Sequence, residues 1–117
     1  MVGDGWTIAD IEAAVEAGEY DDLIRVPIWV SMDPPDCEWA QQLCIRLSGH
    51  SDPQVRANTI LGFGHLARTC GRLNERVVRP LIEAALRQPS PVRGQAEAAA
   101  DDVEHFLGWK VSRVSEA

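Results

Sequence analysis

The chain has 117 residues, a formal net charge of −7 at pH 7, and 45% hydrophobic residues. This length suits one domain with a core of its own, and no apolar run approaches the roughly 18 residues that a membrane-spanning helix needs. The acidic balance argues against a nucleic-acid-binding protein, because such proteins are more often basic. Residues 1–5 have neither the basic nor the apolar part of a secretory signal, so we expect a cytoplasmic protein.

The first third of the chain predicts one clear helix. Thr7 is a good N-cap, and Ile8, Ile11 and Val15 follow at helical spacing as one apolar stripe. Gly18 is a suitable stop for this helix.

Residues 20–32 allow two interpretations. Residues 20–22 can cap a short helix, but Pro27 interrupts any long one. The apolar run at residues 28–30 fits either a strand or the helical turns after that proline. The helical context favours a helix here.

Four further helices are predicted, over residues 37–47, 53–69, about 75–88 and 91–107. A double-proline break at residues 33–36 precedes the first of them, and a turn at residues 71–74 separates the second from the third. The polar tail, residues 110–117, is expected to fray.

The three cysteines are Cys37, Cys44 and Cys70, an odd number. Cys37 and Cys44 are seven residues apart on one predicted helix, a rise of about 10.5 Å, which is too long for a disulfide. We therefore expect all three to be reduced, two of them as small core residues.

Two of the predicted helices open with related sequences, and a Val-Arg pair recurs after 37 residues. A period of this length indicates a stacked helical repeat, whose units bury their apolar faces only against one another. The residues of this signature are Asp52, Pro53, Val55 and Arg56 in the first copy and Pro91, Val92 and Arg93 in the second.

Two glycines lie inside the helix predicted over residues 53–69. Gly62 and Gly64 each cost about 1 kcal/mol relative to alanine in a helix interior. We expect the reason to be close approach of the parallel helix over residues 91–107.

These two units resemble HEAT-like repeats over residues 36–109. The resemblance implies an all-α fold, a short HEAT-like α-solenoid of about five to six helices in a single domain, residues 1–117. Residues 1–33 would form an N-terminal cap, residues 34–109 the repeat units, and residues 110–117 the tail. In HEAT-like repeats the arginine of the signature usually pairs with acidic or backbone groups between units, which implies a structural role for Arg56 and Arg93.

Three segments, residues 34–40, 62–68 and 100–109, also resemble small immunity proteins of bacterial contact-dependent inhibition and polymorphic-toxin systems. This resemblance implies a non-enzymatic protein that binds a cognate toxin C-terminal domain and occludes its active site. The acidic balance suits a basic partner such as a nuclease domain. A HEAT-like scaffold or regulatory module for another cytoplasmic protein is the alternative, and a DNA-binding HEAT-like enzyme is a third. No catalytic motif appears in the chain.

Charge is distributed unevenly along the chain. Residues 1–38 hold ten acids and one arginine, a net charge of −9, whereas residues 39–95 have a net charge of +5 and residues 96–117 one of −3. Glu12 and Glu16 are candidate partner contacts in the first segment. Asp101 and Glu104 are candidates in the last, because their helix ridge carries no nearby basic residue. Solvated helix faces are the alternative explanation.

The repeat predicts a second candidate site. Shifted by 37 residues, His65 matches Asp102 and Arg68 matches His105, so parallel stacking would bring the four into one patch. The patch is either a set of interhelical links or a recognition site, and less readily a catalytic or metal site. Its spacing is not that of a zinc motif, so no metal or cofactor is expected.

The four tryptophans are the last candidates. Trp29 and Trp39 flank the double-proline break, where exposed indoles would serve as interface anchors. Trp6 and Trp109 lie near the two chain ends. Capping of the core ends is the alternative role, favoured for Trp109.

Overall fold

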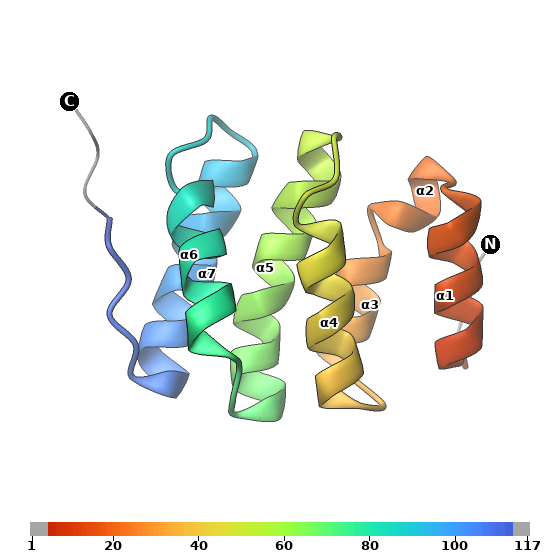
Figure 1. Cartoon of the computed structure of the whole chain (residues 1–117), viewed down its shortest axis with the longest axis horizontal. Helices are drawn as coiled ribbons and strands as arrows, with labels where there is room; N and C mark the ends of the chain where they lie inside the picture. Colours follow the sequence, from red (N-terminus) through yellow and green to blue (C-terminus); the bar gives the residue numbers. More distant parts are fainter. Residues whose placement is uncertain (1–4, 114–117) are drawn as a thin grey trace.

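The computed structural model describes residues 5–113, and all regular structure in that range is helical (Figure 1). The prediction of an all-α fold is therefore confirmed. The helices in chain order are α1 (Ile8–Ala17), α2 (Tyr20–Leu23), α3 (Val26–Met32), α4 (Cys37–Leu47), α5 (Pro53–Cys70), α6 (Glu75–Ala85) and α7 (Val92–Leu107). The number exceeds the expected five to six because residues 20–32 form two helices, of which α2 has only four residues.

The helices stand side by side along the longest axis of the molecule, whose extents are 42 × 27 × 19 Å (Figure 1). From α3 onward they alternate in direction: α3, α5 and α7 run one way, and α4 and α6 run back. Helix α5 packs against α3 and α4 on one side and against α7 on the other. Helices α5 and α7 are therefore parallel neighbours, as the 37-residue shift predicts.

Local sequence signals explain where the helices begin. Thr7 and Asp10 form a reciprocal capping box at α1. The Asp36 carboxylate accepts the backbone N–H of Trp39 over 2.8 Å at the start of α4. Asp52 caps α5 in the same way, with Pro53 in the first turn, where its missing N–H costs nothing.

Helix α6 ends earlier than predicted, at Ala85 instead of Gln88. The next amide groups make tighter bonds, from Arg87 to the Ala84 carbonyl and from Gln88 to the Ala85 carbonyl. The chain therefore continues as a turn up to Pro89, which cannot extend a helix.

The core lies along α5. Phe63 and Leu66 are fully buried there, together with Leu43 and Cys44 from α4 and Val103 from α7. Burial raises the pKa of the Cys44 thiol to about 12, so this cysteine is a free, neutral core residue as expected.

Gly64 allows the close contact between α5 and α7. A Cβ atom at this position would lie 2.7 Å from Asp102 Oδ2 and 3.1 Å from the Cα atom of Ala99. The predicted approach of the two helices at this glycine is confirmed. The same expectation is wrong for Gly62, which faces α3 and α4: a Cβ there would lie 3.2 Å from the Pro27 carbonyl oxygen and 3.4 Å from the Cys44 sulfur.

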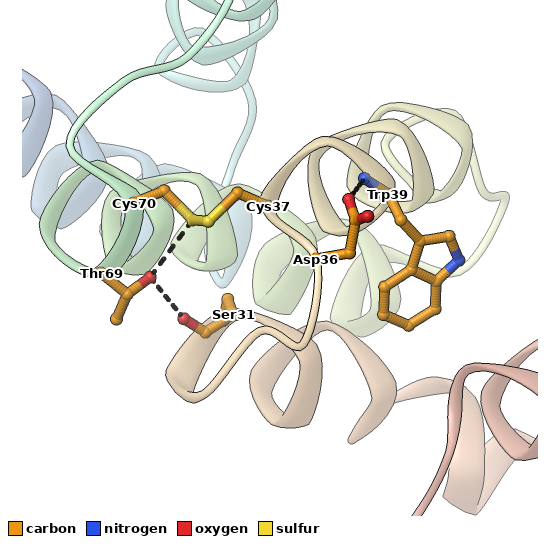
Figure 2. The surroundings of a disulfide bond; sticks show 6 residues. All are labelled: Ser31, Asp36, Cys37, Trp39, Thr69 and Cys70. Carbon is orange, nitrogen blue, oxygen red and sulfur yellow. Dashed lines mark hydrogen bonds between the residues drawn. A yellow bond between two sulfur atoms is a disulfide. The ribbon is translucent and has the colours of Figure 1, made fainter.

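The expectation that all three cysteines are reduced is wrong for two of them. Cys37 at the start of α4 and Cys70 at the end of α5 form a disulfide, with their Cα atoms 6.0 Å apart (Figure 2). The pairing arises because α4 and α5 are antiparallel, which brings together residues 33 positions apart. Disulfides are typical of oxidising compartments, so this finding weighs against the expected cytoplasmic location.

The two arginines of the repeat signature differ in their contacts. Arg56 donates to the backbone carbonyls of His50 and Ser51. It also donates to the side chain of Gln88, which lies in the turn between α6 and α7. Arg93 makes no side-chain hydrogen bond within residues 5–113, where no further hairpin follows α7. The structural role expected of both residues therefore holds for Arg56 alone.

Within the described residues, none of the helices combines the length and the apolar composition needed to cross a membrane.

Candidate protein-binding surface

Trp39 belongs to a linked cluster at the N-terminal end of the molecule. Its indole N–H donates to Glu12 Oε2 over 2.8 Å, and Arg46 forms a salt bridge with the same carboxylate, also at 2.8 Å. The bond from Arg46, followed by that from Trp39, lowers the pKa of Glu12 from its ordinary value. Glu12 is thus engaged within the chain. Glu16, one turn further along α1, is exposed and forms no salt bridge among the described residues.

Trp6 joins the two tryptophans that were predicted as anchors. Its ring packs at a tilt against Trp39, with centroids 6.3 Å apart and planes at 42°. On its other side, Trp6 lines a surface hollow together with Trp29, Met32 and Asp33. Trp29 and Trp39 therefore lie at the same end of the molecule, both half-buried. The sequence analysis placed Trp6 only near the chain end and missed this bridging position.

Ser31, His65 and Asp102 come from α3, α5 and α7 and form a row across these parallel helices. Ser31 Oγ and His65 Nδ1 are 3.0 Å apart. Burial lowers the pKa of His65, the charge of Arg68 lowers it further, and the nearby carboxylate of Asp102 opposes both effects. The contact with Ser31 favours the interpretation of His65 as an interhelical link between α5 and α3, whereas Asp102 acts on His65 only through its charge. The sequence analysis missed Ser31, because only the packing of α3 on α5 reveals it.

The row contains the residue types of a hydrolytic triad, but its geometry does not suit one. Ser31 is fully buried, and its hydroxyl also donates to the Ile28 carbonyl over 3.2 Å. No hydrogen bond joins His65 to Asp102 among the described residues. A serine without access to solvent cannot attack a substrate, so the contact between Ser31 and His65 serves to link α3 to α5.

Arg68 and His105 complete the predicted patch only in part. Arg68 is exposed, and its guanidinium approaches the sulfur of Met32 at 3.6 Å. His105 is exposed and packs edge-on against its neighbour Phe106, with ring centroids 4.6 Å apart. Within residues 5–113, no hydrogen bond, salt bridge or ring contact joins His105 to the other three residues of the patch.

The carboxylates on α7 are compensated, contrary to expectation. Arg113 bonds to Asp101 Oδ1 at 2.8 Å and to Glu104 Oε1 at 2.7 Å. The backbone N–H of Val111 and then Arg113 lower the pKa of Glu104 from its ordinary value. The prediction considered basic residues on the same ridge of the helix alone. Arg113 lies in the segment that follows α7 and folds back along it.

The start of the polar tail is packed, although fraying was expected from residue 110 onward. Val111 is buried, and its backbone N–H donates to Glu104 Oε2 over 3.1 Å. The N–H of Ser112 donates to Glu83 Oε2 over 2.8 Å. Trp109 packs against the core, in agreement with its predicted capping role. The rest of the predicted tail, residues 114–117, lies outside the described residues.

The described part of the chain contains no group of three or more histidine, cysteine, aspartate or glutamate side chains suited to hold a metal ion. Its surface carries the hollow beside Trp6, which Asp33 lines, and several exposed charged residues without salt bridges. Recognition of another molecule is the chemistry that this arrangement offers.

No known protein family matches the chain, and neither the curated proteins nor the solved structures contain a significant match to it.

Proposed function

We propose that this chain is a non-enzymatic inhibitor that binds a basic protein, and that it serves as an immunity protein occluding a cognate toxin domain. A nuclease is the expected class of toxin, because nucleases carry basic surfaces for phosphate backbones. The observation that carries the proposal is a set of open carboxylates together with a surface hollow lined by Trp6, Trp29 and Asp33. Glu16, Glu19, Asp21 and Asp33 are exposed and form no salt bridge within residues 5–113.

This combination suits a protein interface. Unpaired surface charge speeds the encounter with an oppositely charged partner. Tryptophan is enriched among the residues that contribute most to binding free energy. Trp29 lines the same hollow as Asp33, and Trp39 bonds to Glu12 on α1, the helix that also carries Glu16.

The finer architecture is also part of the proposal. We infer a short HEAT-like α-solenoid from the 37-residue recurrence, the alternating helix directions and the bond from Arg56 to Gln88 in the next hairpin. An exposed face on stacked hairpins is a common binding surface in such folds. The architecture fits an inhibitor and a scaffold equally, so the two functions are distinguished by identifying the protein that the chain binds.

The test is co-expression with the C-terminal domain of the large protein encoded beside this chain. We expect relief of that domain's toxicity and a one-to-one complex in light scattering. Failure of both, with the domain shown to be folded and toxic, would overturn the immunity proposal and favour a scaffold for another protein.

Association kinetics test the acidic surface. Reversing Glu16 and Glu19 to lysine should slow association and flatten its dependence on salt. Reversing both Asp101 and Glu104, which already pair with Arg113, changes the net charge equally, so it is the matched control and should have the smaller effect. Equal effects would move the interface away from the N-terminal end.

A DNA-binding enzyme is the remaining candidate, because residues 39–95 carry eight arginines. Arg72, Arg76 and Arg87 are exposed and form no salt bridge within residues 5–113. Tight, salt-dependent binding of duplex DNA by the purified chain would favour this candidate over the inhibitor.

A further inference from the structure

A surface hollow of 380 Å³ lies beside α3. This volume is near the lower end of the roughly 300–1,000 Å³ that is typical of ligand pockets. The lining combines two indoles, a thioether and one carboxylate with small apolar groups. The lining residues are Gly5, Trp6, Ile28, Trp29, Met32, Asp33 and Pro35.

This lining matches the chemistry of a guanidinium group. Indole faces attract cations that sit over the ring, and a carboxylate can accept two parallel hydrogen bonds from a guanidinium. Arginine stacks on aromatic faces and is more weakly hydrated than lysine, so it loses less on leaving water. Trp6 and Trp29 supply the rings here, and Asp33 supplies the charge.

We propose that the hollow is the binding site for an arginine side chain of the protein partner. The inference rests on the proposed function, since it assigns the basic partner one anchoring residue. Asp33 is exposed and forms no salt bridge among the described residues, so its charge is open to a ligand. Met32 is 50% exposed, and Arg68 contacts its sulfur at 3.6 Å.

One wall of the hollow is held in place before any ligand arrives. Trp6 packs on Trp39 at 6.3 Å, and the Trp39 indole is itself fixed by its hydrogen bond to Glu12. A wall that is already ordered loses little conformational entropy on binding, and this favours affinity.

The chain's own Arg68 opposes the incoming charge. Its guanidinium lies 3.6 Å from the Met32 sulfur and does not line the hollow. Replacing it, as in Arg68→Gln, should therefore strengthen binding of a cation at the neighbouring site. A gain in affinity on loss of Arg68 is expected for a cationic ligand alone, because a neutral ligand is not repelled by the arginine charge.

The experiment uses the full chain and N-acetyl-L-arginine amide as the probe, followed by the tryptophan indole N–H signals in two-dimensional NMR. We expect saturable shifts for Trp6 and Trp29, with Trp109 unchanged as an internal control. N-acetyl-L-citrulline amide has nearly the same shape without the charge and should bind about tenfold more weakly. Equal binding of the two amides would overturn the proposal.

Two variants of equal charge change locate the site. Asp33→Asn should weaken arginine amide binding about tenfold, whereas Glu16→Gln, on α1 and outside the hollow, should change it much less. If both variants bind the amide equally, attraction is general to the acidic surface and the assignment to the hollow is wrong.

Measurements on the free chain separate this inference from the proposed function. Saturable binding of the amide without any toxin-domain complex would support the site and overturn the immunity role. A one-to-one complex unaffected by Asp33→Asn, with no amide binding, would support the immunity role and overturn the site.

Discussion

Helix α5 contacts its neighbours differently on its two sides, and the acidic residues on the two sides differ in whether they form salt bridges. On the side of α3 and α4, a disulfide joins Cys37 to Cys70, and the Thr69 hydroxyl donates to the Ser31 carbonyl over 3.1 Å (Figure 2). On the side of α7, the contact is close apolar packing over Gly64. No side-chain hydrogen bond joins α5 to α7 within residues 5–113.

The acidic residues also differ between the two sides. On the α7 side, Arg113 closes Asp101 and Glu104 into an ion-pair network. On the α3 side, Glu12 pairs with Arg46, whereas Glu16, Asp21 and Asp33 have no salt bridge among the described residues. The comparison teaches that negative charge in a sequence does not identify a binding surface. What matters is whether the fold places a basic side chain next to the carboxylates.

The largest expected effect is on the disulfide side. The double variant Cys37→Ser with Cys70→Ser should lower the free energy of unfolding by about 3–4 kcal/mol, because the bond closes a loop of 33 residues in the unfolded chain. Denaturant unfolding under non-reducing conditions measures it. Reduction of the native protein should produce a similar loss and should leave the serine variant unchanged.

A companion measurement addresses the compartment. If the bond exists in the cell, alkylation in denaturant after an acid quench of intact cells should block one thiol, that of Cys44. Three blocked thiols would show that Cys37 and Cys70 are reduced there, as the cytoplasmic expectation requires.

The α7 side should respond next most strongly. Gly64→Leu should cost about 1–3 kcal/mol of stability, because the new side chain meets the backbone of Ala99 and forces α5 and α7 apart. Gly94→Leu on the exposed face of α7 is the matched control, since nothing lies within 4 Å of a Cβ there. Thermal unfolding that ranks the control as equally destabilised would contradict the close packing described at Gly64.

A smaller, pH-dependent effect is expected from His65. Its pKa is lowered in the folded state, so the unfolded chain binds more protons and stability rises with pH. This contribution is complete above the ordinary histidine pKa of about 6.5 and is lost as pH falls through the lowered value. Solvent screening keeps it below about 1 kcal/mol.

The measurement is denaturant unfolding of wild-type protein and His65→Gln at pH 7.5 and pH 5.5. The wild type should lose more stability between the two values than the variant. A parallel loss in both proteins would assign the dependence to other groups.

The smallest expected effect concerns the ion pairs of Arg113. Arg113→Gln should change stability by less than about 1 kcal/mol, because Asp101 is largely exposed and Arg113 and Glu104 are each exposed by about a third. It should, however, restore free negative charge at Asp101 and Glu104. If the variant binds a basic partner faster than the wild type, the distinction between carboxylates with and without a salt bridge is confirmed.

The sequence by itself determined the local architecture of this protein. Caps at Thr7, Asp36 and Asp52 placed three helix starts, because each side chain acts only on backbone groups within the next three residues. The 37-residue recurrence and Gly64 even predicted which helices run parallel in contact.

Only the tertiary structure decided the pairings between distant residues. Spacing excluded a bond between Cys37 and Cys44, but the bond from Cys37 to Cys70 depends on α4 and α5 being antiparallel. The contact of Ser31 with His65 and the return of Arg113 to α7 likewise join residues whose separation has no helical period. The hollow beside Trp6 is of the same kind, because its walls come from segments before and after α1 and α2. Local periodicity reports on one helix at a time, and such sites exist only where several helices pack together.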